Sequence, residues 1–196
     1  FIANPPDVFV GIDAPDFNLQ LEKKLKKAGI KTIQYVSPQV WAWRQNRVKH
    51  IAKSVNQVLA LLPFEKTFYR NHKIPVTFVG HPLADTIDLE TPKLPAREEL
   101  GLSAGDKVLA LLPGSRSSEV KKLGTTFLDA AAHFQQQIPE CKILIAALTE
   151  KTKALIVEQL VEFPNLKNVQ ISIGQSRTVM TASDVLLVAS GTVTLE

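Results

Sequence analysis

The sequence lacks the features of several large protein classes. Its single cysteine, Cys141, sits in an apolar run and cannot form an intramolecular disulfide, which fits a reducing compartment. No apolar run approaches the roughly 18 residues of a transmembrane helix, and no signal-peptide pattern or short internal repeat is present. The 196 residues are 45% hydrophobic and 21% charged, which indicates a globular chain of one large or two small domains.

Several binding motifs are missing as well. The glycine fingerprint of dinucleotide-binding proteins and the Walker phosphate loop are both absent, and no His/Cys/Asp spacing is typical of a metal site. We therefore expect no cofactor and no metal. The net charge of +4 and a pI of about 9.2 suit an anionic membrane surface, a phosphorylated ligand or nucleic acid without choosing among them. Because no nucleic-acid-binding motif is present, we expect no nucleic-acid partner.

Short apolar runs alternate with amphipathic stretches along the chain. Strands are expected at 8–12, 32–36, 58–62, 76–79, 108–112, 143–147, 169–173 and 185–188. Helices are expected from Phe17 towards Gly29 and at 48–54, 120–134, 153–161 and 177–182. Apolar strands that are each followed by a helix predict an α/β fold, with parallel sheets covered on both faces.

This alternation is interrupted once. Residues 85–95 are polar, contain two prolines and show little periodicity, which is typical of a linker. We therefore expect two Rossmann-like domains, residues 1–84 and 96–196, joined through 85–95. Phe1 opens inside an apparent unit and Glu196 stops where a helix should begin. We expect both domains to be incomplete and the chain to be an internal part of a longer protein.

The loop after the strand at 108–112 is the first candidate site, because open parallel sheets bind ligands beyond the carboxyl ends of their strands. It reads Pro113-Gly114-Ser115-Arg116 and leads into a long helix. Unpaired backbone N–H groups and the helix dipole favour an anion there, and Arg116 can bond phosphate oxygens bidentately. A helix start capped by Ser115 or Ser117, with Arg116 in solvent, explains the same residues without a ligand.

A second strand leads into a similar small-residue turn. After 185–188 come Ser190, Gly191 and Thr192, with Glu196 about one turn into the expected helix. A carboxylate at that place can accept hydrogen bonds from ribose hydroxyls. It can also simply stabilise the helix dipole by about 0.3–1 kcal/mol, which is the simpler explanation when this loop is taken alone.

The loop after the first strand carries Asp13, Asp16 and Asn18. Two acids and an amide at a strand end can supply a general base. A helix opening with Pro15 in the first turn explains one of these acids but not both together with the amide.

The loop after 32–36 holds both tryptophans of the chain, Trp41 and Trp43, followed by Arg44. They fit an aromatic platform or a membrane-interface anchor, and ordinary packing is the alternative.

His81, at the domain junction, is the only histidine near a candidate cleft.

In this order, the four loops resemble the lipid-A-disaccharide synthase family, bacterial glycosyltransferases with the GT-B fold. The matching segments span nearly the whole chain: residues 7–18, 37–44, 62–65, 80–82, 111–116 and 189–192. Ile-Asp-Ala-Pro-Asp-Phe-Asn and Trp-Ala-Trp-Arg are distinctive enough to indicate this family rather than glycosyltransferases in general. The resemblance implies two Rossmann-like domains whose parallel sheets face a central cleft.

The resemblance implies an inverting hexosyltransferase of lipid A (lipopolysaccharide) biosynthesis in Gram-negative bacteria. Such an enzyme transfers 2,3-diacylglucosamine from UDP-2,3-diacylglucosamine to the 6-hydroxyl of 2,3-diacylglucosamine 1-phosphate. The products are a β-1,6-linked disaccharide phosphate and UDP. GT-B enzymes need no metal to bind the diphosphate. Because both substrates carry acyl chains, a peripheral protein on the cytoplasmic face of the inner membrane is implied. A homodimer is left open.

The resemblance also implies roles for the loop residues. Arg116, Gly114 and Ser115 would stabilise the leaving diphosphate. The UDP site would be completed by Ser190, Gly191, Thr192 and Glu196, with Glu196 on the ribose. Asp13 is the expected base, with Asp16 and Asn18 in reserve, and the acceptor or membrane side would include Asn18, Trp41, Trp43, Arg44 and His81.

Two other functions compete with this one. Another GT-B enzyme, a UDP-N-acetylglucosamine transferase or epimerase, would share the phosphate loop and the ribose carboxylate. A non-catalytic sugar-nucleotide-binding module would bind the ligand without turnover. The family's N-terminal glycine-rich loop and its C-terminal segment are not in this sequence, so little or no activity is expected from these 196 residues alone.

Overall fold

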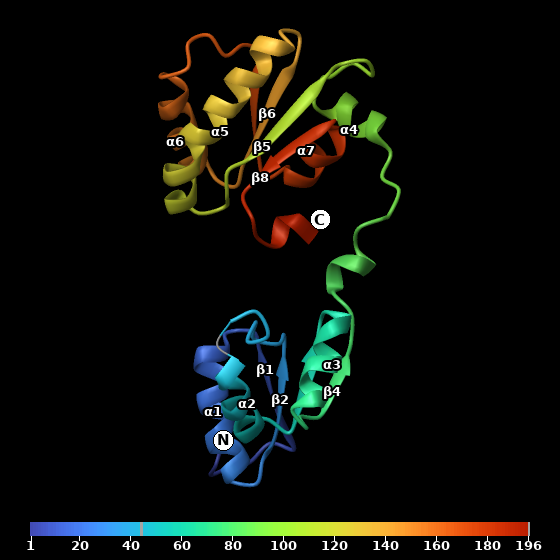
Figure 1. Ribbon diagram of the computed structural model, residues 1–196, viewed down its shortest axis with the longest axis vertical. Helices are drawn as coiled ribbons and strands as arrows, with labels where there is room; N and C mark the ends of the chain where they lie inside the picture. Colours follow the sequence, from blue (N-terminus) through green and yellow to red (C-terminus); the bar gives the residue numbers. More distant parts are fainter. Residues whose placement is uncertain (44, 196) are drawn as a thin grey trace. The chain divides into compact units, whose positions relative to one another are not determined.

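The computed structural model describes residues 1–43 and 45–195, which divide into two compact units, Phe1–Thr86 and Ile87–Glu196. In the described residues each unit holds one sheet of four parallel strands flanked by helices (Figure 1). The strand order is β1-β2-β3-β4 in the first unit and β7-β6-β5-β8 in the second. The expected α/β class with two Rossmann-like parallel sheets is confirmed.

In the first unit, the helices pack against one face of the sheet. Leu19, Ile51, Val58 and Tyr69 belong to the buried core on that face. The elements are β1 (Val8–Ile12), α1 (Pro15–Lys27), β2 (Lys31–Tyr35), η1 (Gln45–Arg47), α2 (Val48–Ser54), β3 (Gln57–Ala60), α3 (Pro63–Asn71), β4 (Val76–Phe78) and η2 (Pro82–Asp85).

The opposite face of this sheet is partly open. Val8, Val10 and Ile12 alternate along β1 with inward-facing residues and are 42–65% exposed. The expectation that both faces are covered is therefore wrong for this sheet within the described residues. Apolar strands suggest burial on both faces, but here none of the described helices packs against the outer row.

The second unit has a core on each face of its sheet. Helices α5 and α6 cover Leu109 and Ile143, whereas α4 and α7 cover Ala110 and Leu144, so β5 is buried throughout (Figure 1). Here the expected cover on both faces is confirmed. The elements are α4 (Lys93–Glu99), β5 (Val108–Leu112), α5 (Ser117–Gln137), β6 (Lys142–Ala147), α6 (Glu150–Leu160), β7 (Val169–Ile173), α7 (Ser176–Ala182), β8 (Val185–Val188) and η3 (Thr192–Leu195).

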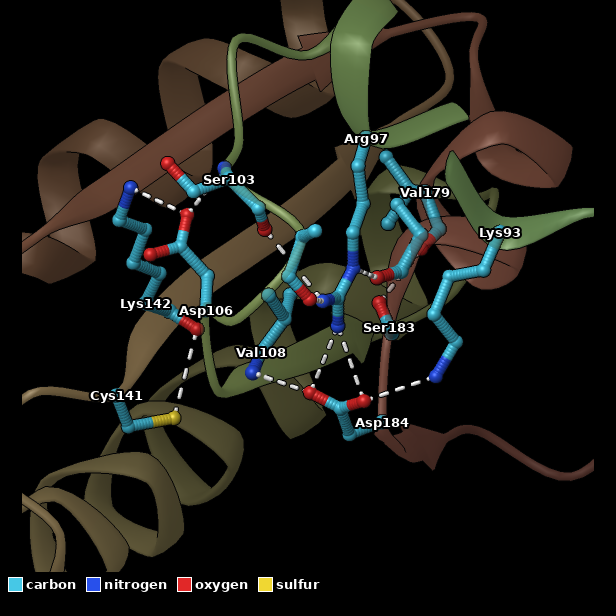
Figure 2. A network of polar contacts seen from close by, with 12 residues as sticks. Lys93, Arg97, Ser103, Asp106, Val108, Cys141, Lys142, Val179, Ser183 and Asp184 are labelled. Atoms are coloured by element: carbon cyan, nitrogen blue, oxygen red, sulfur yellow. Dashed lines mark hydrogen bonds and ion pairs between the residues drawn. The ribbon is translucent and has the colours of Figure 1, made fainter. Parts of the chain in front are cut away.

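Helix α4 begins at Lys93, inside the segment that the sequence assigns to a linker. The helix is anchored by Arg97, whose charged side chain is buried. The guanidinium donates to the carbonyl of Ala182 at 2.9 Å. It also donates to both carboxylate oxygens of Asp184 (2.9 and 3.0 Å), as Figure 2 shows. Residues 93–95 are thus helical and not part of a linker. The sequence does not predict this helix, because polar contacts hold it in place of the apolar periodicity from which helices are predicted.

No helix in the described part of the chain is long and apolar enough to cross a lipid bilayer. Within the same residues, no group of three or more His, Cys, Asp or Glu side chains is arranged to hold a metal ion.

Candidate functional site

The carboxyl ends of the strands in the second unit surround a cavity of about 730 Å³. Two loops chosen from the sequence contribute to its lining, the first with Gly114, Ser115 and Arg116 and the second with Ser190 and Gly191. They meet because β5 and β8 are paired neighbours with Leu112 opposite Val188, so both strands end at the same edge of the sheet.

The turn after β5 is built around Gly114. Its φ of 126° lies in the left-handed region, and a Cβ at this position would stand 2.6 Å from the Cβ of Glu119. Only glycine therefore lets the turn approach the first turn of α5 this closely. In the structure it is Glu119 that uses this close approach.

Glu119 is the carboxylate that occupies the donors of this turn. It accepts from the backbone N–H groups of Ser115 (3.0 Å) and Arg116 (3.1 Å) and pairs with the Arg116 guanidinium at 2.7 Å. The Arg116 backbone N–H and guanidinium hold the pKa of Glu119 below its usual range. Arg116, not Ser115 or Ser117, is the N-cap residue of α5. Two N–H groups and one guanidinium thus converge on a single anionic group.

The first unit has its own cavity, of about 300 Å³, at the ends of β1 and β2. Asp13 and Val36 line it, and both have positive φ angles, 50° and 69°. Ala14, with a φ of 38°, continues the strained turn. Left-handed backbone costs about 1–3 kcal/mol per non-glycine residue and is rarest for a β-branched one such as valine. Strain of this kind gathers at functional sites, which supports this cavity as one.

Buried amides hold the strained Asp13 turn in place. The Asp13 carbonyl accepts from Asn18 Nδ2 at 2.8 Å and from Gln34 Nε2 at 3.0 Å, while its N–H donates to the Tyr35 carbonyl at 2.9 Å. The Asn18 amide thus faces the backbone of the turn. Its proposed place on the acceptor side is therefore indirect, since it shapes the loop that carries Asp13.

The two candidate bases lie in different surroundings. Asp16 is exposed and forms an ion pair with Arg47, and all three of Asp13, Asp16 and Arg47 line the cavity of the first unit. The Asp13 carboxylate is exposed and accepts no hydrogen bond from the described residues. A substrate hydroxyl would thus find Asp13 without a competing partner.

The tryptophan loop is anchored by α3, a helix that the sequence did not predict. Trp41 donates its indole N–H to Glu65 Oε1 at 3.2 Å, and the Ser37 and Tyr69 hydroxyls lie 2.7 Å apart. Tyr69 is fully buried, and this burial raises the pKa of its hydroxyl to about 12. Trp43 is 57% exposed and lines the cavity with Asp13. The loop therefore ties Trp41 to α3 and leaves more than half of the Trp43 side chain exposed at the cavity.

The sequence model of the lipid-A-disaccharide synthetase family matches residues 1–196. The chain belongs to the lipid-A-disaccharide synthetase family. It is 58% identical over 197 residues to the lipid-A-disaccharide synthase of Pseudoalteromonas translucida, covering all of this chain and 51% of that protein. The synthases of Hahella chejuensis and Vibrio vulnificus are each 51% identical, with 50% and 52% of those proteins covered. The chain thus spans about half the length of these relatives.

Four further residues that the resemblance to the synthetase family selects lie outside the two cavity linings described above or outside the described residues. Arg44 and Glu196 lie outside the described residues. Thr192 begins the short helix η3, so the expected helix after β8 starts as a 3-10 turn. His81 caps η2, with its Nδ1 accepting from the Leu83 N–H at 3.1 Å, and lines neither cavity described above.

Other residues of this synthetase-family chain belong to the two sites although the sequence did not single them out. Glu119 stands three residues after the N-cap position, the spacing of a capping box, and that signal identifies it. Arg47 and Glu65 lie near the chosen loops without a motif of their own. Gln34 and Glu22 are polar residues at buried positions, which nothing in the local pattern reveals.

Proposed function

We propose that the full-length protein with this chain is an inverting GT-B glycosyltransferase that makes the lipid A disaccharide. It would join UDP-2,3-diacylglucosamine to 2,3-diacylglucosamine 1-phosphate and release UDP. The observation that carries the proposal is the family match along the whole chain. The two strand-end cavities supply a place for each half of the chemistry.

The second-unit cavity is the proposed UDP site. Its volume is within the range of about 300–1,000 Å³ that small-molecule sites have. The Ser115 and Arg116 N–H groups and the Arg116 guanidinium would bond the diphosphate, and the Ser190–Gly191 turn would close the other side. Glu196 would hold the ribose. Donors fixed before the reaction stabilise the charge that develops on the leaving UDP, which is how this site would lower the barrier.

The first-unit cavity is the proposed acceptor site. Asp13 would take the proton of the 6-hydroxyl as its oxygen bonds to the anomeric carbon, while the bond from that carbon to the UDP oxygen breaks. Attack from the face opposite UDP inverts the anomeric centre. The ion pair between Asp16 and Arg47 leaves Asp13 as the preferred base.

Exposed apolar residues beside the acceptor cavity fit acylated substrates. Ile12, Phe17 and Trp43 are 57–71% exposed, and two of them adjoin Asp13 and Asp16 in the chain. Apolar and tryptophan side chains at a surface suit the interfacial region of a bilayer. They support a peripheral position at the cytoplasmic face of the inner membrane.

A turnover assay of the full-length protein tests the proposal. With acylated UDP-glucosamine and acylated glucosamine 1-phosphate, we expect UDP release and a disaccharide product. Asp13→Asn should abolish turnover while UDP still binds, because the amide cannot accept the proton.

The other possible outcomes would point to a different function or to a different base. Turnover of non-acylated sugars alone would favour another GT-B enzyme, and UDP binding without any turnover would favour a binding module. A near-wild-type rate for Asp13→Asn would move the base role to Asp16, to be checked with Asp16→Asn.

A further inference from the structure

A buried carboxyl group lies directly under the Asp13 turn. Glu22 of α1 is fully buried against β1, where a Cβ on Gly11 would overlap Glu22 Oε1 and stand 3.0 Å from Gln34 Oε1. Gly11 and Gln34 are also register partners on neighbouring strands. The missing side chain at Gly11 therefore makes the space in which Glu22 and Gln34 come together.

Three acceptor oxygens of these two side chains are buried here, and the only side-chain donor of the pair, Gln34 Nε2, is directed to backbone carbonyls instead. Both carboxyl oxygens of Glu22 and Oε1 of Gln34 are buried without a hydrogen-bond partner. The Gln34 amide cannot turn round, because its Nε2 lies 3.0–3.2 Å from the carbonyl oxygens of Asp13, Tyr35 and Val36. A proton on Glu22 would convert one of the three acceptors into a donor to Gln34 Oε1 and so reduce the cost of leaving them unpaired.

The surroundings of Glu22 favour that proton. Burial raises the pKa of Glu22 to about 7. The backbone N–H of Gly11 lies nearby and favours the charged carboxylate, so it partly offsets this rise. Strand β1 carries no charged residue, and in residues 1–43 and 45–195 no charged side chain forms an ion pair with Glu22. The titratable groups of β2 and α2, the other elements packed on α1, are Lys31, Tyr35, Lys49, His50 and Lys53.

We propose that Glu22 is a positioning residue for Asp13: in its protonated form it donates to Gln34 Oε1 and so fixes the amide that holds the Asp13 and Val36 carbonyls. The proposal rests on the proposed function, in which Asp13 is the base. When the proton is lost, a carboxylate faces the amide oxygen of Gln34. Repulsion between the carboxylate and this oxygen then weakens the hydrogen bonds through which the Gln34 amide holds the left-handed turn at Asp13.

Variants of Glu22 in the full-length protein test this role through turnover against pH. Wild-type kcat should fall as the pH rises through about 7, because the neutral carboxyl predominates below that pH and the carboxylate above it. Glu22→Gln is neutral at every pH and can still donate to Gln34 Oε1. Its kcat at pH 6 should stay within about twofold of wild type, as for other volume-conserving changes, and should not fall above pH 7.

Glu22→Ala removes the donor and leaves a space. Its kcat should fall about 10- to 100-fold, the range expected when a reacting group is misplaced. The affinity for UDP should not change, because the proposed UDP cavity is built entirely from the second unit. Glu90→Gln, at an exposed acid in the segment after η2, is the matched control and should keep the wild-type pH profile.

The outcomes separate this proposal from the proposed function. If Glu22→Gln keeps the wild-type fall above pH 7, or loses as much kcat as Glu22→Ala, the proton on Glu22 has no positioning role and the proposal is wrong. Should Glu22→Ala not fold, the comparison between Glu22→Gln and wild type still decides. An active Asp13→Asn variant would instead overturn the base assignment, whatever the Glu22 variants do.

Discussion

Arg116 contributes both a backbone N–H and a guanidinium to the turn after β5, and in the structure Glu119 accepts from both. The same donors are those that a diphosphate would need. In the proposed UDP complex, one anionic partner would replace another, and Arg116 would give up a bond 2.7 Å long to its own helix. The affinity gained from Arg116 would be a difference between these two partners, not the full strength of an arginine–phosphate contact.

Replacing Arg116 measures that difference. Arg116→Ala in the full-length protein should weaken UDP binding by about 1.5–3 kcal/mol, the usual net value of a hydrogen bond to a charged group. Arg116→Lys keeps the charge but loses the bidentate geometry, so it should recover only part of the affinity. Isothermal titration calorimetry with UDP is the measurement. An unchanged dissociation constant for Arg116→Ala would remove this residue from the diphosphate site.

Single residues differ in how far the sequence reveals their roles. Asp13, Gly114 and Arg116 were found because each follows a predicted strand, and strand ends in a parallel sheet are where ligands bind. The sequence does not reveal Glu22 and Gln34, because an amphipathic pattern does not distinguish a polar residue in the core from one on the surface. The proposed role of these two residues depends on their contact with Gly11, which exists only after β1 and β2 have paired.

At the scale of the element, α4 depends on a single buried cation. Arg97 ties α4 to the end of α7 through Ala182 and to the start of β8 through Asp184. Asp184 also accepts from the Val108 N–H of β5 at 2.9 Å (Figure 2). Lys93 pairs with the same carboxylate at 2.8 Å. Burial alone would raise the pKa of Asp184, but the contacts with Lys93, the Val108 N–H and Arg97 together hold it below its usual value.

Removing the Arg97 guanidinium should therefore destabilise the second unit. Arg97→Met has a similar length but leaves the Ala182 carbonyl without its donor and Asp184 without its buried partner. We expect a loss of about 1–3 kcal/mol in the free energy of unfolding, since the Ala182 carbonyl loses its donor whereas Asp184, which is 42% exposed, keeps Lys93 and the Val108 N–H. Thermal or urea unfolding of the full-length protein measures the loss.

A surface ion pair provides the control for Arg97. Lys107 and Glu140 pair at 2.7 Å with both side chains 60% exposed, so Lys107→Met should change the unfolding midpoint by no more than the error of the measurement. If Arg97→Met were equally harmless, α4 would be held by its apolar contacts with α7, and the polar network would have no part in its stability.

The helices show where the sequence stops being informative. The strands were predicted well because short runs rich in β-branched and other apolar residues, each followed by an amphipathic stretch, are typical of an α/β fold. Helices α3 and α4 were not predicted, because both bury polar side chains, Glu65 and Tyr69 in one and Arg97 in the other. The cost of burying these polar side chains is offset by hydrogen bonds to segments distant in the chain, and no local sequence pattern reveals such bonds.

On the scale of the whole molecule, the proposed chemistry is divided between two separately folded sheets. The first unit carries the strained Asp13 turn and the second carries the Gly114–Arg116 turn, each at the carboxyl edge of its own parallel sheet. Each turn is held by contacts within its own unit: Asn18 and Gln34 in one, Glu119 in the other. Binding of the nucleotide and activation of the acceptor should therefore respond to different substitutions.

A double variant tests this division. In the full-length protein, Asp13→Asn should leave the UDP dissociation constant unchanged, because the residues proposed to bind the diphosphate all belong to the second unit. The double variant Asp13→Asn/Arg116→Ala should then bind UDP as weakly as Arg116→Ala alone, within the roughly 0.5 kcal/mol by which independent sites add. Calorimetry on the four proteins completes the cycle. A coupling larger than that would mean that Asp13 also acts on the nucleotide, and its role would then include the donor sugar as well as the acceptor hydroxyl.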